Sequence, residues 1–141
     1  MSNVPLINPL SGQISFGRVP EIKSRSLYVP AGHIHLRKGR HIGPNQGFGA
    51  LHIWAEHSKE MRQRNFCAVE DVPAYVASII RVGTPLHFPG GNLRRTRIIA
   101  VQASTGMAIL EQQSYLGDTV WSVVTAYSGK RKDGPRIGAV S

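Results

Sequence analysis

Two stretches of the chain repeat apolar residues with the period of an α-helix. The first, residues 49–65, gathers its apolar residues on one side when each residue turns the helix by about 100°. These residues are Ala50, Leu51, Ile53, Trp54 and Met61. His57 falls at the edge of this apolar side, whereas His52 points to the opposite side. The position of His57 is typical of a hydrogen-bonded residue at the edge of a core, or of a titrating site residue.

The second stretch, from about Asp71 to about Val82, carries the start and stop signals of a helix. Asp71 can act as the N-cap, and Pro73 lies in the first turn, where a missing backbone N–H is tolerated. Gly83 then ends the helix. The residues that follow the apolar spacing of a helix are Val72, Tyr75, Val76, Ile79 and Ile80. We expect this helix to pack on the core.

Beyond residue 84 the pattern changes from helical spacing to the alternation of strands. Strands are expected at residues 85–88, 94–102, 107–112 and 119–127, with turns rich in Gly, Asn, Ser and Asp between them. A further short strand is expected at 26–29. Helices followed by an antiparallel meander predict an α+β fold, with two N-terminal helices packed on one face of a twisted antiparallel β-sheet.

The remaining segments indicate where the domain begins and ends. Residues 1–23 contain three prolines and two glycines with little periodicity, which indicates an extended leader or linker. A single domain then covers residues 24–141 and ends in a basic tail. The first residues lack the basic and apolar regions of a signal peptide, and no stretch approaches the ~20 apolar residues that cross a bilayer.

Composition narrows the function classes. The net charge is +9, with 17 Lys and Arg against eight Asp and Glu. Such a balance favours a polyanionic partner, most simply nucleic acid, although an acidic protein would also fit. The single cysteine, Cys67, excludes an internal disulfide scaffold and a cysteine-built zinc site. We therefore expect the protein to act in the cytoplasm, in its own cell or in a target cell.

A cluster of histidines and cations lies between residues 32 and 49. The histidines are His33, His35 and His41, and the cations are Arg37, Lys38 and Arg40. An HxH pair on a strand, as in His33 and His35, can chelate a metal ion. However, no cysteine or nearby carboxylate follows at ligand spacing, so we expect no metal here. A solvated basic segment is the favoured interpretation, and its basic residues could hold phosphates.

The last strand ends in hydroxyl groups. Regular alternation would place Thr125 and Tyr127 on the same side as Trp121 and Val123. High strand propensity and a hydrogen-bonded tyrosine would explain these residues without a function. Lys130 lies three residues after Tyr127, so the end of this strand also combines hydroxyls with positive charge.

Two motifs in this order resemble the barnase, EndoU, colicin and RelE-like superfamily of ribonucleases, and most closely its phage- and polymorphic-toxin-associated branches. The helix motif matches at Gly49, His52, Ile53 and His57, and the strand motif matches at Val123, Thr125 and Tyr127. The resemblance covers roughly residues 47–131. It implies attack of the ribose 2′-OH on the adjacent phosphate, which leaves 2′,3′-cyclic phosphate and 5′-OH ends without a metal or cofactor.

The residues of this chain can be assigned roles in such a reaction. His57 is expected to act as general base or acid. Arg97 is expected to be the phosphate cation, with Arg95 next, because arginine stabilises charge where it develops. Thr125 would hydrogen-bond the scissile phosphate, and Tyr127 would orient it or stack on a base.

Further groups are needed for the second proton and for the RNA backbone. His41, His33 and His35 are the candidates for the second acid or base. The expected backbone contacts are Arg37, Lys38, Arg40 and Lys130.

The resemblance also implies partners. RNA is the expected substrate, with tRNA favoured, and an acidic immunity protein or antitoxin would cover the cationic face. The chain fits a delivered toxin domain or a free-standing phage product. Three alternatives stay open: an RNA-binding module without catalysis, a β-rich protein that binds metal through His33 and His35, and a phage structural protein.

Overall fold

The computed structural model describes residues 1–24, 26–90, 98–129 and 134–141. Its helices are α1 (Gly49–Gln63) and α2 (Val72–Ile79), with the short 3₁₀-helix η1 (Val69–Asp71) between them. The strands before α1 are β1 (Arg18–Val19), β2 (Ile22–Lys23), β3 (Tyr28–Val29), β4 (Gly32–His35), β5 (Arg40–Gly43) and β6 (Gln46–Phe48). The strands after α2 are β7 (Pro85–His87), β8 (Ile98–Ala103), β9 (Gly106–Tyr115), β10 (Asp118–Tyr127) and β11 (Arg136–Ala139). The chain is therefore an α+β protein.

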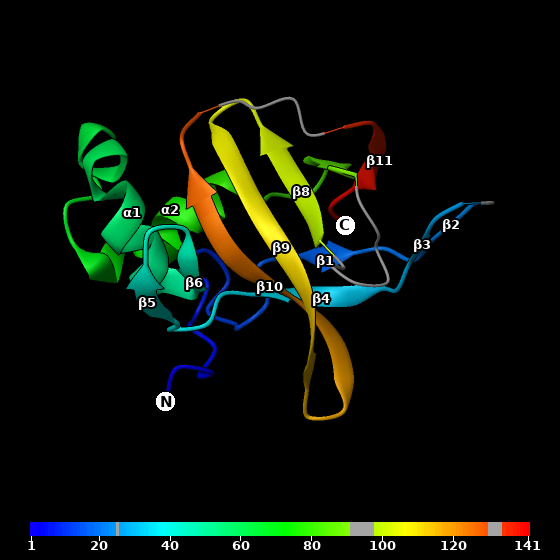
Figure 1. Cartoon of the computed structure of the whole chain (residues 1–141), viewed down its shortest axis with the longest axis horizontal. Coiled ribbons are helices and arrows are strands. Elements are labelled where there is room, and N and C mark those ends of the chain that lie inside the picture. The colour runs from blue at the N-terminus through cyan, green and yellow to red at the C-terminus, as the bar shows by residue number, and fades with distance from the viewer. Residues whose placement is uncertain (25, 91–97, 130–133) are drawn as a thin grey trace.

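Seven strands form one mostly antiparallel sheet in the order β1-β4-β10-β9-β8-β7-β11 (Figure 1). Only the β4–β10 pair among its described pairings is parallel. The two ends of the sheet approach each other, because Arg18 and Ser141 exchange two backbone hydrogen bonds of 3.0 and 2.9 Å. The sheet is thus curved into a nearly closed barrel. The hairpins β2–β3 and β5–β6 stand outside it.

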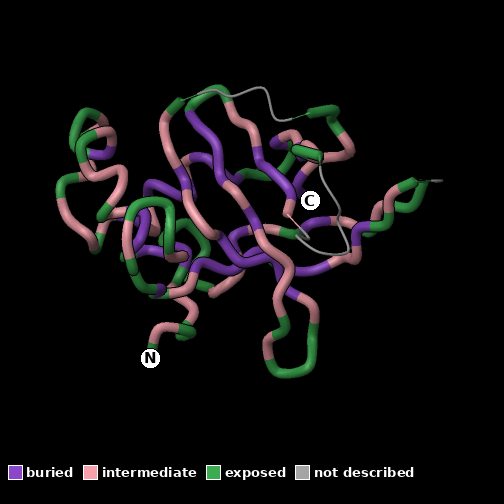
Figure 2. The backbone as a smooth tube through the Cα atoms, in the orientation of Figure 1, coloured by how far each residue is buried: buried purple, intermediate pink, exposed green. Residues whose placement is uncertain are grey.

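One face of this sheet forms the core. The residues of β8, β9 and β10 in the core cluster are Ile99, Val101, Ala108, Leu110, Trp121, Val123 and Ala126. Figure 2 shows this buried backbone running through the three strands. All five residues predicted to form the apolar side of the second helix are buried, which confirms that prediction. From α1, the core receives Ala50, Ile53 and Met61.

Both helices lie in the middle of the chain, so the expected N-terminal position is wrong. Six strands of two to four residues precede α1. Strands this short contain too few residues to establish a period of two, and they are held by backbone pairing instead. α1 and α2 lie beside the C-terminal half of β10, which β4 does not pair with (Figure 1).

The expected leader and the expected basic tail are also part of this architecture. Phe16 and Val19, which fall within the expected leader, are buried in the core. In the expected basic tail, residues 136–139 form β11, which pairs with β7. No helix in the described part of the chain is long and apolar enough to span a membrane.

Candidate functional site

A β-bulge near the end of β10 determines which side chains face the candidate site. The register of β10 on β9 shifts between Val123, opposite Leu110, and Thr125, opposite Ile109, so Val124 is the extra residue. Because one extra residue reverses the alternation, Thr125 and Tyr127 do not share a face with Trp121 and Val123 as predicted. They lie on the outer face of the sheet, opposite the core.

Tyr127 on this outer face lies beside the predicted histidine of α1. The ring centroids of His57 and Tyr127 are 5.5 Å apart, with a tilt of 33° between the ring planes. His57 departs from helical geometry, with φ −130° and ψ 17°, and α1 is kinked there. Its side chain is partly exposed, at 22% of the reference area. The structure therefore brings His57 and Tyr127 together at an accessible point.

Glu60 holds the other side of the His57 ring. Its Oε1 lies 3.1 Å from His57 Nδ1, and its Oε2 accepts a 2.8 Å hydrogen bond from the backbone N–H of Ser128. Ser128 follows Tyr127 directly and pairs through its hydroxyl with the Tyr75 hydroxyl of α2, at 2.8 Å. One carboxylate thus joins the kink of α1 to the end of β10.

A second histidine cluster lies one and a half turns earlier on α1. His52 was expected to point away from the apolar side, yet it is buried, with 4% of its surface exposed. The β5–β6 hairpin covers that side of the helix, and His52 Nδ1 lies 3.1 Å from His41 Nδ1. Gly47 makes this approach possible, since a Cβ there would lie 2.7 Å from His52 Nδ1.

Glu56 connects this cluster to the tip of the hairpin. Its Oε1 accepts a 2.6 Å hydrogen bond from the backbone N–H of Asn45 and lies 3.9 Å from His52 Nε2. The hydrogen bond from Asn45 is the main cause that lowers the pKa of Glu56. Burial lowers the pKa of His52, which Glu56 opposes and which His41 and His57 reinforce. His52 is therefore held neutral while His41 remains exposed to solvent.

Three of the predicted cations lie at the start of α1, where the backbone N–H groups of Ala50 and Leu51 bond to the carbonyls of Arg37 and Lys38. Arg37 donates a 2.7 Å hydrogen bond from Nε to Ser122 Oγ, and its guanidinium lies 4.0 Å from the centre of the Phe48 ring. Lys38 and Arg40 are exposed beside it. The predicted cations Arg97, Arg95 and Lys130 lie outside the described residues.

His33 and His35 lie at the other end of β10. They pair with Val120 and Ser122, five to seven residues before Tyr127. At about 3.3 Å per residue, Ser122 and Tyr127 are roughly 16 Å apart along the strand. The structure therefore does not bring these two histidines to His57.

Both of these histidines are engaged locally. His33 Nδ1 lies 2.8 Å from Ser15 Oγ, and the buried His35 packs edge-on against Tyr115 at 5.2 Å. Burial lowers the pKa of His35, and His33 and Arg37 lower it further. Within the described residues, no group of three or more His, Cys, Asp or Glu is placed to hold a metal ion.

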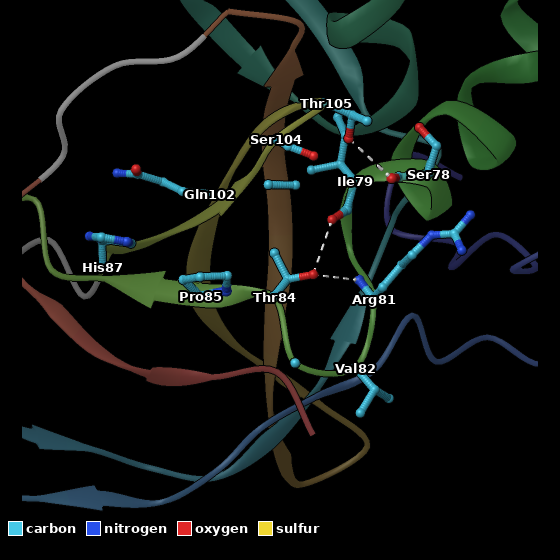
Figure 3. Close-up of a pocket in the computed structure, with 12 residues that line it drawn as sticks. Ser78, Ile79, Arg81, Val82, Thr84, Pro85, His87, Gln102, Ser104 and Thr105 are labelled. Carbon is cyan, nitrogen blue, oxygen red and sulfur yellow. Dashed lines mark hydrogen bonds between the residues drawn. The ribbon is translucent and has the colours of Figure 1, made fainter.

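A separate open pocket of about 760 Å³ lies at the C-terminal end of α2 (Figure 3). It is lined by the α2–β7 connection, the start of β7 and the β8–β9 turn. The Thr84 and Thr105 hydroxyls at its wall bond to the backbone of α2 and its C-terminal end. It contains none of the predicted site residues, and we do not assign the candidate site to it.

Sequence reasoning missed Glu56 and Glu60 as partners of the histidines. Their spacing was the available signal, because Glu56 follows His52 by four residues and Glu60 follows His57 by three. Side chains at these separations meet on one helix face. The burial of His52 carried no such signal, since it depends on the hairpin.

The arrangement can perform proton transfer. An imidazole whose Nδ1 faces a carboxylate has its Nε2 available to a substrate, and a second exposed imidazole stands near the same helix. The comparisons with known proteins do not identify the chemistry further: no protein-family model, curated protein or solved structure matches the chain.

Proposed function

We propose that the protein is a metal-independent endoribonuclease that cleaves RNA by attack of the ribose 2′-OH. The observation that carries this proposal is the contact of His57 with Tyr127, backed by Glu60, on the open outer face at the end of β10. A titratable imidazole, a carboxylate that faces it and an aromatic hydroxyl meet there.

In the proposed reaction, the 2′ oxygen forms a bond to the adjacent phosphorus and the bond to the 5′ oxygen breaks. One group must accept the 2′-OH proton, and another must donate a proton to the departing oxygen. His57 is assigned to one of these roles. Tyr127 orients the phosphate or stacks on a base, and Thr125, on the same outer face, hydrogen-bonds the phosphate.

His41 is assigned as the second acid or base. It is exposed, and it is held through His52 on the same helix that carries His57. Besides the hydrogen bond from Asn45, the charges of His52, His41 and His57 each lower the pKa of Glu56. All three imidazoles therefore lie around one part of α1. His33 and His35 have no comparable connection to His57.

Positive charge provides the binding surface for RNA. Arg37, Lys38 and Arg40 are assigned to the RNA backbone. Arg97 and Arg95 are assigned to the reacting phosphate, and Lys130 to the backbone, on the basis of the sequence alone. A single domain with net charge +9 and few acidic groups supports a polyanionic substrate, and tRNA is the favoured class.

We propose a place in the barnase, EndoU, colicin and RelE-like superfamily on the basis of the two sequence motifs. The elements that bear on this proposal are the histidine-bearing α1, the second helix α2 and the meander of β8, β9 and β10 that ends at Tyr127. In this proposal the protein is a toxin that acts in the cytoplasm. An acidic immunity protein or antitoxin would neutralise it by covering the cationic face.

The test is incubation of the protein with tRNA and ribosomal RNA at neutral pH in EDTA, followed by mapping of the new ends. The proposal expects cleavage with 2′,3′-cyclic phosphate and 5′-OH ends. Binding of RNA without cleavage would instead identify a non-catalytic RNA-binding module. Cleavage that stops in EDTA would contradict the metal-independent mechanism.

A further inference from the structure

We infer that Glu60 is a positioning residue that fixes the His57 imidazole with Nδ1 protonated and Nε2 directed to the substrate. This inference rests on the proposed function and deepens it. Glu60 does not touch the reacting atoms. It acts through His57, and it joins His57 to the strand that carries Tyr127.

The hydrogen-bond partners of Glu60 determine the tautomer of His57. A carboxylate has only acceptor oxygens, so each group bound to it must donate. Oε2 accepts the backbone N–H of Ser128 at 2.8 Å, and Oε1 lies 3.1 Å from His57 Nδ1. The proton of neutral His57 must therefore be on Nδ1, and the lone pair of Nε2 is free to accept a proton.

The same contacts fix the position of the ring. Ser128 is the residue after Tyr127, so Glu60 binds the end of β10 with one oxygen and His57 with the other. This connection crosses from α1 to the sheet at the kink, where His57 has left helical geometry. Without the carboxylate, the distance between the His57 ring and Tyr127 would no longer be fixed. Small displacements of reacting groups slow catalysis strongly.

The carboxylate also keeps its contact when His57 accepts a proton during the reaction. When Nε2 accepts a proton, the imidazolium retains a charge-assisted hydrogen bond from Nδ1 to Glu60. Glu56 on the same helix lies 3.9 Å from the Nε2 of the buried His52 and binds the hairpin instead. Glu60 is therefore the carboxylate matched to the accessible imidazole.

The first measurement is the ¹⁵N NMR spectrum of the His57 ring at about pH 8, above the usual titration range of histidine. The wild-type protein is expected to show the Nδ1–H tautomer. Glu60→Ala is expected to shift His57 toward the Nε2–H tautomer. Glu60→Gln is expected to give a mixture of the two tautomers, because its single amide oxygen can accept from His57 Nδ1–H or from Ser128 N–H but not from both at full strength. A wild-type ring protonated at Nε2 would overturn the inference.

The second measurement is steady-state cleavage of RNA in EDTA by the same variants. Glu60→Gln is expected to lower kcat by roughly ten- to a hundredfold with KM nearly unchanged, because it loses the charge and can accept only one of the two hydrogen bonds that Glu60 accepts. Glu60→Ala is expected to lower kcat further. Glu70→Gln is the matched control, since Glu70 is an exposed glutamate on η1 and should leave kcat unchanged. Equal kcat in wild type and Glu60→Gln would contradict the inference.

The two readouts separate the inference from the proposed function. If no RNA is cleaved, the proposed function fails, and the tautomer still decides whether Glu60 positions His57. If RNA is cleaved but His57 carries its proton on Nε2, the inference alone fails. Thermal unfolding of each variant detects loss of folding, for which Glu60→Gln provides the conservative substitution.

Discussion

The helix α1 carries two histidine–carboxylate pairs that differ in their access to solvent. In both, the carboxylate also accepts a backbone N–H from outside the helix, of Asn45 for Glu56 and of Ser128 for Glu60. His52 is buried and faces a second histidine, whereas His57 is partly exposed and faces Tyr127.

This difference indicates how one helix can support two roles. Burial lowers the pKa of His52, and its contact with His41 joins α1 to the β5–β6 hairpin, so His52 is assigned a structural role. His57 has an accessible ring with a carboxylate behind it, which are the properties of a proton-transfer group. Solvent access, more than residue type, separates the structural imidazole from the proposed catalytic one.

The substitution that tests this contrast most strongly is His57→Ala. We expect it to lower the rate of RNA cleavage by about 10²- to 10⁴-fold, the usual contribution of a general acid or base. Folding and RNA binding should be nearly unchanged. Rates on one RNA in EDTA provide the measurement. His87→Ala, a histidine on β7, is the control and should cleave at the wild-type rate.

A somewhat smaller effect is expected from His41→Ala. Loss of the second acid or base should slow cleavage on the order of 10²-fold. His33→Ala should have little effect, because His33 pairs at the opposite end of β10. A reversed result, in which His33→Ala slows cleavage and His41→Ala does not, would show that the second acid or base lies away from α1.

The burial of His52 should also affect how the free energy of unfolding depends on pH. The unfolded chain binds a proton on His52 near its usual pKa of about 6.5, while burial lowers the pKa of folded His52. The unfolded state therefore binds more protons in this window, and the free energy of unfolding falls as pH falls below about 6.5.

Urea unfolding between roughly pH 7.5 and 5.5, about one unit either side of the usual histidine pKa of about 6.5, measures this slope. His52→Gln should make the slope shallower without removing it, because the lowered pKa of His35 acts in the same direction. The partners His41, Glu56 and His57 remain in both proteins. An unchanged slope in His52→Gln would show that burial of His52 does not control its protonation.

The smallest effects are expected at the exposed cations. Lys38→Ala or Arg40→Ala should weaken RNA binding modestly at low salt. Each lost phosphate contact should reduce the slope of log affinity against log salt by roughly 0.7 to 0.9. Binding isotherms at several salt concentrations measure this slope. Glu70→Gln, which removes no positive charge, should not reduce it.

The helices and the two long strands β9 and β10 were predictable because their side chains carry long, regular patterns. The apolar face of α2 was predicted residue by residue, and β9 and β10 were placed within a few residues. The first six strands were mostly not predictable. They are two to four residues long, and pairing with distant segments, such as β4 with β10, holds them in place.

The candidate site was predictable only in part. His57 followed from the edge of an apolar helix face, and Glu60 could have followed from its three-residue spacing. The amino-acid sequence of the strand alternates regularly and does not indicate the bulge at Val124. The sheet face of Thr125 and Tyr127 was therefore predicted incorrectly. The contact of His41 with His52 depends on the β5–β6 hairpin, for which no strands were predicted.

The central claim is that this site transfers protons in an attack by the ribose 2′-OH. Its most direct test is single-turnover cleavage, in EDTA, of an RNA oligonucleotide and of the same oligonucleotide with a 2′-deoxy sugar at the mapped cleavage position. The account predicts that the RNA is cut and that the substituted oligonucleotide stays intact at that position. Equal cleavage of both, or cleavage of neither, would contradict it.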